Sequence, residues 1–182
     1  MNTLARLVLQ QAQTQWRQLD DHIGWCDERI AAHAKDNDAV KKAATLIGIG
    51  PITASAVVAT VVDFKQFSNA AQFGAWIGLV PRQDSSGGKN RLGRITKRGD
   101  TYLRTMQIQG AKSTVMTAHK RSDPISQWAA ALRDRAGWQK AVVALANKNA
   151  RILWAVMTKG EAFNARHVSV KPGAAAPATA SA

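Results

Sequence analysis

Apolar positions recur at helical spacing along most of this chain. Residues 3 to about 35 contain no proline and a single glycine, and their apolar side chains follow a loose helical period. This pattern predicts one long helix or two in tandem. A second periodic block, from Trp138 to Lys159, has a broad apolar face and lies between Gly137 and Gly160, which suit helix ends. Shorter apolar runs lie between the two blocks, and the pattern as a whole predicts an all-α fold.

Two short helices are expected on either side of a glycine-rich turn. The first runs from Ala39 to Leu46, and the second begins at Ile52, directly after Gly48, Gly50 and Pro51. Such a helix-hairpin-helix turn can expose backbone N–H groups at a helix N-terminus, which bind phosphate. An ordinary helical turn that ends on a glycine is the alternative interpretation.

Further helix starts follow from capping residues. Ser68 is expected to cap a helix that runs through Leu79, and Asp100 is expected to cap the next one. Between Pro81 and Asp100 the chain is polar and rich in glycine, without apolar periodicity. This segment predicts a long polar loop that can contain a short hairpin, and loops of this length in compact domains are usually functional or disordered.

The chain is strongly basic, and this charge indicates the kind of partner that it binds. Its 182 residues carry 25 Lys and Arg against 12 Asp and Glu, a formal net charge of +13. Residues 82–121 hold ten basic groups against two acidic ones, a net charge of +8. We therefore expect a polyanion, most simply nucleic acid, to bind the middle of the chain.

Several classes of site and location are excluded. Cys26 is the single cysteine, and no cluster of His and Cys offers a metal site, so no metal is expected in this chain. No apolar stretch approaches the roughly 18 residues needed to span a bilayer, and the N-terminus turns polar too soon for a secretory signal. We expect no membrane partner and a cytoplasmic location.

The basic segment after Pro81 allows two kinds of chemistry. It can be a solvated loop or a non-specific nucleic-acid patch, since each cation that neutralises a phosphate adds salt-dependent affinity without catalysis. Alternatively, Ser85 or Ser86 can act as a nucleophile toward phosphorus, with the surrounding cations stabilising the developing charge. Residue types alone favour the first interpretation, because no base for the serine is evident.

The order of these motifs resembles a known family. The stretch LIGIGPITASAVVATVVDFKQFSNAAQFGAWIGLVPRQDSSGGKNRLGRITKRGDTYLRTMQIQGAK, followed by VALANKNARILWAVMTKGEAF, is similar to the C-terminal half of the DEDD insertion-sequence transposases related to the Piv and MooV DNA invertases. The resemblance covers roughly residues 40–165. It implies site-specific DNA transposition with a structured guide RNA, and we also expect a homo-oligomer.

The resemblance also implies roles for particular residues. The serine that becomes covalently joined to DNA matches Ser86, with Ser85 as the neighbour that can be confused with it. Gly48 and Gly50 match the hairpin of the helix-hairpin-helix motif. The expected DNA-binding cations around the loop are Arg82, Lys89, Arg91, Arg94, Lys97, Arg98 and Arg104.

Family members carry a RuvC-like N-terminal domain with four metal-binding carboxylates, and no such pattern precedes residue 40. We therefore expect an N-terminally truncated member that is inactive alone, with no cofactor in this chain and magnesium in the missing domain. The expected organisation is a coiled-coil remnant (1–38), a transposase domain (39–163) and a disordered tail (164–182). The transposase domain contains the helix-hairpin-helix motif (39–62) and the basic serine loop (81–100).

Three functions remain open on these grounds. The first is a transposase domain that binds DNA and carries the serine nucleophile. The second is a non-catalytic helix-hairpin-helix module that binds DNA or RNA. The third is a helical assembly module whose long N-terminal helix drives dimerisation.

Overall fold

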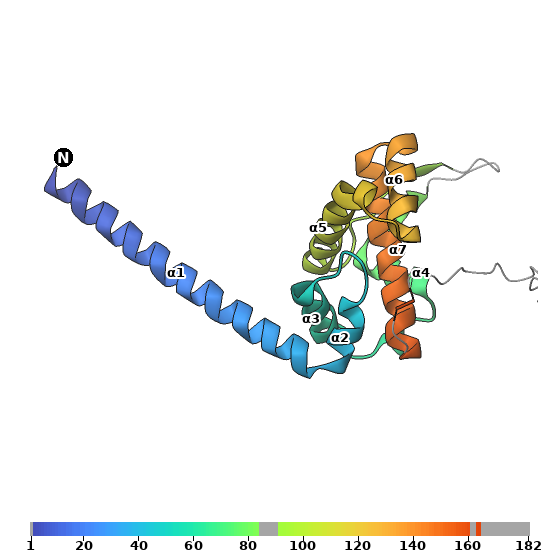
Figure 1. Ribbon diagram of the computed structural model, residues 1–182, viewed down its shortest axis with the longest axis horizontal. Helices are drawn as coiled ribbons and strands as arrows, with labels where there is room; N and C mark the ends of the chain where they lie inside the picture. The colour runs from blue at the N-terminus through green and yellow to red at the C-terminus, as the bar shows by residue number, and fades with distance from the viewer. Residues whose placement is uncertain (1, 84–90, 161–162, 165–182) are drawn as a thin grey trace, which may run out of the picture.

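The described part of the chain is a helical body from which one long helix projects. The computed structural model describes residues 2–83, 91–160 and 163–164. Figure 1 shows α1 joined to the body at one end, with the other helices gathered together. The α-helices within the described ranges are α1 (Thr3–Asp36), α2 (Asp38–Ala44), α3 (Pro51–Thr60), α4 (Ala70–Ile77), α5 (Thr101–Thr117), α6 (Pro124–Ala136) and α7 (Trp138–Lys159).

Helix α7 forms the centre of the body and packs against α4, α5 and α6. It has the predicted bounds, because Gly137 (φ 89°) precedes it and Gly160 (φ 72°) ends it in the left-handed conformation. Small and branched side chains on its inner face let the neighbouring helices approach closely. The buried apolar residues of that face are Ala141, Val142, Leu145, Ala146, Ala150, Leu153 and Val156.

Helices α2 and α3 are the predicted short pair, and residues 45–50 form the turn between them. Asn37 caps α2, since its Oδ1 accepts a hydrogen bond from the backbone N–H of Ala39 at 2.9 Å. The side-chain amide of Asn149 in α7 donates to the carbonyl oxygen of Ile47 at 2.8 Å. The turn is therefore attached to the central helix by a hydrogen bond between residues far apart in the sequence.

A glycine in the turn and a glycine in α5 let these two segments pack closely against each other. Gly48 has φ +84°, and a Cβ there would lie 2.7 Å from Oγ1 of Thr114. A Cβ on Gly110 would lie only 1.7 Å from the carbonyl oxygen of Gly48, which is far inside any real contact distance. Only glycine fits both positions, so the turn and α5 touch backbone to backbone.

The start of α4 differs from the prediction by one residue. Asn69 caps the helix in place of Ser68, because its Oδ1 accepts a hydrogen bond from the backbone N–H of Gln72 at 2.9 Å. The backbone N–H of Ser68 instead donates to the side-chain oxygen of Gln72. Serine and asparagine are both strong cap formers, so the sequence alone does not separate two neighbours of these types.

An aromatic cluster joins α4 to the segment that precedes it. The ring of Phe73 lies 5.1 Å from that of Phe67 and 5.5 Å from that of Phe64, measured between centroids. Trp76 completes the cluster, 5.4 Å from Phe67. The indole N–H of Trp154 in α7 donates to the carbonyl oxygen of Phe64 at 3.1 Å. The cluster is thus attached to the central helix, and Phe67 and Phe73 are buried.

The all-α prediction needs one amendment, because the basic segment contains a small antiparallel sheet. Strand β1 (Pro81–Gln83) pairs with β2 (Leu92–Ile95), with Pro81 opposite Ile95 and an irregularity in the register between Pro81 and Gln83. The strands are exposed and carry no alternating apolar pattern, so the sequence permits this hairpin without specifying it. Apart from Asn164, the predicted tail lies outside the described residues.

Helix α1 is one continuous helix of 34 residues and contains no buried residue. Asn2 caps it, with its Oδ1 accepting a hydrogen bond from the backbone N–H of Leu4 at 3.2 Å. Of the two predicted alternatives, the structure has the single long helix. Helix α1 contacts α2 and α3. None of the helices within the described ranges is long and apolar enough to cross a membrane.

The contact between the turn and α5 predicts opposite effects for two glycine substitutions in helices. Gly110→Ala should lower the free energy of unfolding by about 2 kcal/mol or more, because the new methyl group overlaps the Gly48 carbonyl. Gly24→Ala in α1 meets nothing within 4 Å and should be neutral or stabilising by up to about 1 kcal/mol. Chemical denaturation of both variants measures this difference, and equal losses would contradict the packing described.

Candidate nucleic-acid interface

The β1–β2 hairpin is attached to the body through backbone hydrogen bonds at its base. Helix α4 ends at Gly78, in the left-handed conformation with φ 80°. The N–H of Thr96 donates to the carbonyl oxygen of Val80 at 2.9 Å, and that of Lys97 donates to the carbonyl oxygen of Gly78 at 3.2 Å. Leu79, which lies between Gly78 and Val80 just before β1, is fully buried. The first end of the hairpin therefore continues into the core, and the second end is attached to it by these two hydrogen bonds.

Two glycines let the chain cross itself at this base. A Cβ on Gly78 would lie 2.0 Å from the carbonyl oxygen of Arg98, and one on Gly99 would lie 1.7 Å from that of Trp76. Both glycines also have positive φ, +80° and +105°. No other residue type fits either position without displacing backbone, so the crossing of α4 and the segment before α5 is fixed by the sequence.

The crossing leads directly into α5. Asp100 caps this helix as predicted, since its Oδ1 accepts a hydrogen bond from the backbone N–H of Leu103 at 2.7 Å. Arg104, one turn into the helix, donates from Nη1 to the carbonyl oxygen of Ile77 at 3.2 Å and from Nη2 to Oγ1 of Thr101 at 3.1 Å. The predicted DNA-binding residue Arg104 thus joins the end of α4 to α5 and is half-buried.

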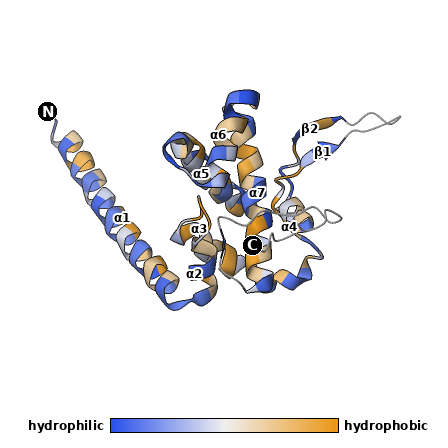
Figure 2. Ribbon diagram, turned by 45° about the vertical axis from the view of Figure 1, so that its right-hand side comes forward, coloured by the Kyte–Doolittle hydropathy of each residue, from blue (hydrophilic) through white to orange (hydrophobic). Residues whose placement is uncertain are grey.

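Three predicted cations come together on the exposed surface of the hairpin. Arg82 on β1, Arg94 on β2 and Lys97 just after β2 line a shallow hollow together with Gly93 and Ile95. The three cations are exposed, and within the described ranges none of them forms an ion pair. Figure 2 shows the two strands projecting from the body on the side away from α1.

Lys97 has an uncommon backbone conformation. Its φ is +55°, and it is the sole non-glycine residue with positive φ in the described part of the chain. Such a conformation is costly for a side chain with a Cβ and persists when surrounding contacts impose it. Here the hydrogen bond from Lys97 to Gly78 and the adjacent glycine crossing impose it. This backbone conformation of Lys97 sets the direction of the chain between β2 and α5.

Of the remaining residues predicted around the loop, the structure describes Arg91 and Arg98 but not Ser85, Ser86 or Lys89. Arg98 is exposed, and its carbonyl oxygen lies against Gly78. Arg91 is exposed next to β2. Ser85, Ser86 and Lys89 lie outside the described residues, so the structure does not place the predicted nucleophile.

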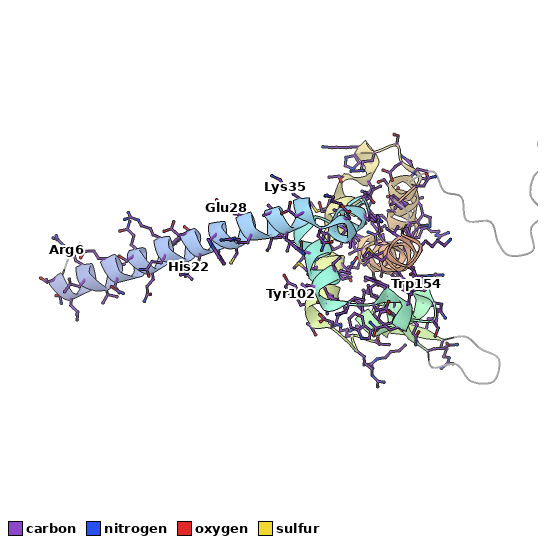
Figure 3. The ribbon with its side chains drawn as sticks, turned by 90° about the horizontal axis from the view of Figure 1, so that it is seen from below. Arg6, His22, Glu28, Lys35, Tyr102 and Trp154 are labelled. Atoms are coloured by element: carbon purple, nitrogen blue, oxygen red, sulfur yellow. The ribbon has the colours of Figure 1, made fainter. Side chains whose placement is uncertain are left out.

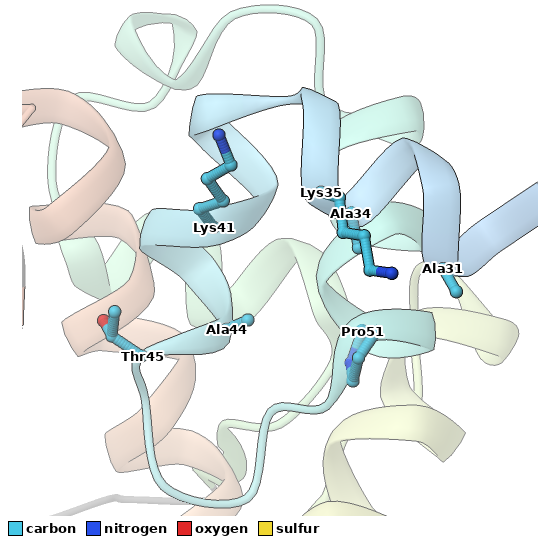
Figure 4. Close-up of a pocket in the computed structure, with 7 residues that line it drawn as sticks. All are labelled: Ala31, Ala34, Lys35, Lys41, Ala44, Thr45 and Pro51. Carbon is cyan, nitrogen blue, oxygen red and sulfur yellow. The ribbon is translucent and has the colours of Figure 1, made fainter.

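The glycine turn between α2 and α3 lies in a different part of the body. Gly48 is half-buried against α5, whereas Gly50 is exposed at the N-cap of α3, which has no side-chain capping hydrogen bond. Beside it, an apolar hollow lies between the end of α1 and the start of α3 (Figure 4). Lys35 and Lys41 line this hollow, and sequence reasoning assigned no role to either.

Lys41 is already partnered. Its ammonium group lies 3.0 Å from the carboxylate of Asp38, three residues earlier in α2. This hydrogen bond and the charge of Lys41 hold the pKa of Asp38 below its ordinary value. The turn therefore presents less unpaired charge than the hairpin does, and the hairpin is the stronger candidate for phosphate contact.

No three His, Cys, Asp or Glu side chains come together to form a metal site in the part of the chain that the structure describes. The exposed groups that converge are cationic. Guanidinium and ammonium groups bind phosphate through charge-assisted hydrogen bonds, and the guanidinium can do so with two parallel bonds. The arrangement on the hairpin is thus suited to a polyanion.

Comparison with known proteins shows that the chain is similar to transposases. Residues 40–127, which run from α2 into α6, match the model of the "Transposase IS116/IS110/IS902 family". The chain is 44% identical over 152 residues to a Pseudomonas aeruginosa protein named "Probable family 20 transposase". It is 44% identical over 144 residues to the transposase for insertion sequence element IS1111A of Coxiella burnetii, and 37% identical over 153 residues to that for IS1328 of Yersinia enterocolitica.

These alignments cover 84%, 79% and 80% of this chain, but only 45%, 40% and 46% of the respective relatives. The chain thus spans less than half the length of the curated relatives it matches. The comparisons show a transposase-family domain within the chain and make it a homologue of insertion-sequence transposases. This confirms the insertion-sequence transposase part of the predicted resemblance.

Proposed function

We propose that this chain is a DNA-binding part of an insertion-sequence transposase and that the β1–β2 hairpin contacts the sugar-phosphate backbone. The observation that carries the proposal is the convergence of Arg82, Arg94 and Lys97 on an exposed surface without ion-pair partners among the described residues. Cations that are not neutralised internally are available to displace the counterions condensed on DNA.

The anchoring of the hairpin supports the same proposal. Cations on freely moving chains lose conformational entropy when they bind, which offsets part of the gain from each phosphate contact. Here the strands are held by the Thr96 and Lys97 hydrogen bonds and by the crossing at Gly78 and Gly99. The two guanidinium groups start from adjacent paired strands, so much of their arrangement is set before DNA arrives.

The catalytic part of the proposal concerns Ser86, which lies in the sequence between β1 and β2. Its Oγ would attack a backbone phosphorus, forming a serine-phosphate ester as the bond to one sugar oxygen breaks. The serine proton leaves with a base, and the departing sugar oxygen takes up a proton to become a hydroxyl. Nearby cations would stabilise the negative charge that develops on the phosphoryl oxygens.

Magnesium is not assigned to this chain. The residues that the structure describes bring together no donor set for it, and no step of the proposal passes through a metal. We propose that the carboxylates and the magnesium expected from the family lie in a separate RuvC-like domain. A non-catalytic module that binds DNA or RNA would share the cationic hairpin but not the serine chemistry.

Reversing the charge of hairpin cations should weaken DNA binding more than the same change in net charge made elsewhere on the chain. Arg82→Glu/Arg94→Glu should weaken binding to a short duplex at least about tenfold at physiological salt. It should also lower the slope of log affinity against log salt by about 1.8, since each phosphate contact contributes about 0.9. Titrations at several salt concentrations measure both quantities.

A matched control is Arg17→Glu/Arg29→Glu, which makes the same change in net charge on exposed positions of α1. This variant should keep most of the affinity and the salt slope, because α1 projects on the other side of the body from the hairpin. If both double variants lose affinity equally, the hairpin is not the contact surface.

If Ser86 is the nucleophile, the serine that aligns with it in an active relative should form a covalent intermediate with DNA. Substituting alanine for the serine that aligns with Ser86 should abolish the protein–DNA adduct seen on a denaturing gel while DNA binding persists. Alanine at the position that aligns with Ser85 should leave the adduct in place. An undiminished adduct in the first variant would refute the assignment of Ser86 and would favour the non-catalytic module for this chain.

A further inference from the structure

Three of the four tryptophans in the body are engaged by neighbouring groups. Trp76 belongs to the aromatic cluster, and the indole N–H of Trp154 donates to a backbone carbonyl oxygen at 3.1 Å. The ammonium group of Lys148 lies 4.4 Å from the centre of the Trp128 ring. The fourth, Trp138, is 39% exposed, and within the described ranges its side chain forms no hydrogen bond, aromatic contact or cation–π contact. Its ring is therefore available to a ligand.

A single residue, Gly137, connects α6 to Trp138 at the start of α7. Its φ of 89° and ψ of 156° lie in a region that is accessible essentially to glycine alone. Hydrogen bonds hold it from both sides, because its N–H donates to the carbonyl oxygen of Arg133 at 2.9 Å and its carbonyl oxygen accepts from the N–H of Ala141 at 3.1 Å. The backbone of Trp138 is thus fixed between two helices, so less freedom is lost when its ring binds a ligand.

The charges around Trp138 are positive. Arg135 lies three residues before it and Lys140 lies two residues after it, and both are exposed. Neither of them forms an ion pair in the part of the chain that the structure describes, and the carboxylate of Asp134 is paired with Arg133 at 3.1 Å. An exposed aromatic ring with unpaired cations on both sides suits a single nucleic-acid strand, because cations contact phosphates and the ring stacks on a base.

The junction of α6 and α7 lies at the same end of the body as the β1–β2 hairpin. Figures 1 and 2 show this junction and the two strands at the upper end of the body. The junction itself lies outside residues 40–127, which match the family model. A strand that leaves a duplex held by the hairpin could therefore reach a second surface at this end.

We propose that the tip of the α6–α7 pair, defined by Arg135, Trp138 and Lys140, binds an unpaired segment of a DNA strand. The indole of Trp138 stacks on one base, and the two cations contact the flanking phosphates. The proposal rests on the proposed function in that the chain binds DNA, and it adds a contact that selects unpaired bases. A strand that is exchanged between two duplexes must leave its first partner, which exposes such bases. Every base has an aromatic face, so the contact should show little sequence preference.

Replacing the indole tests the stacking contact. Trp138→Ala should weaken binding of a short oligothymidylate strand at least about fivefold, and it should leave the slope of log affinity against log salt unchanged, because the indole carries no charge. Trp138→Phe keeps a ring and should lose less affinity. Fluorescence anisotropy of a labelled strand at several salt concentrations measures both quantities, and the thermal transition of each variant shows that it is folded.

The matched control is Trp16→Ala, because Trp16 is 70% exposed and lies on α1. Figure 3 shows α1 extending away from the body, from Lys35 toward Arg6. This variant should bind the strand as tightly as the unsubstituted chain. Arg135→Glu/Lys140→Glu should lower the salt slope by about 1.4, since each phosphate contact with a single strand contributes about 0.7.

A duplex of the same length separates this proposal from the proposed function. Trp138→Ala should change duplex affinity less than about twofold, because paired bases are not available for stacking. Equal losses for strand and duplex would overturn the selection of unpaired bases. Single-strand affinity that survives both Trp138→Ala and Arg135→Glu/Lys140→Glu would overturn the tip as a site, even where Arg82→Glu/Arg94→Glu weakens duplex binding as the hairpin proposal expects. Losses in the tip variants alone would support the tip and contradict the hairpin.

Discussion

Backbone crosses backbone without room for a Cβ atom at two places in the part of this protein that the structure describes. At the first, Gly48 in the α2–α3 turn meets Gly110 of α5, and at the second, Gly78 and Gly99 bring the end of α4 against the segment that precedes α5. The exposed hairpin depends on the second crossing, because its two ends leave the core there. The first crossing fixes α5, which the hairpin segment enters. The cationic surface is thus held by glycine positions that carry no charge.

This arrangement divides the chain into parts with different physical roles. The body is stabilised by burial around α7, where small residues such as Ala146 and Ala150 allow close helix packing. Among the described residues, Arg82, Arg94 and Lys97 have no ion-pair partner, and helix α1 contains no buried residue. The transposase-family domain thus has a charged exposed surface at the hairpin and an apolar exposed surface on α1.

Local signals predicted most of the fold. Helix α7 has the expected bounds because the glycines at its ends and its apolar period act within the segment itself, and the Asp100 cap is equally local. The role of Gly48 is not local, since a turn that packs against Gly110 has the same residues as one that exposes its N–H groups to phosphate. The half-buried position of Arg104 depends on α4, 27 residues earlier, and no pattern within α5 indicates it.

The hairpin base is held by hydrogen bonds to the end of α4, so its cations are positioned in the free protein. Hydrogen exchange of the Thr96 and Lys97 amides tests this most directly, because both donate across the base of the hairpin. We expect the two amides to exchange nearly as slowly as the buried amides of α7, in the absence of nucleic acid. Exchange at the rate of an exposed loop would contradict it and would show that the cationic surface is not organised in the free protein.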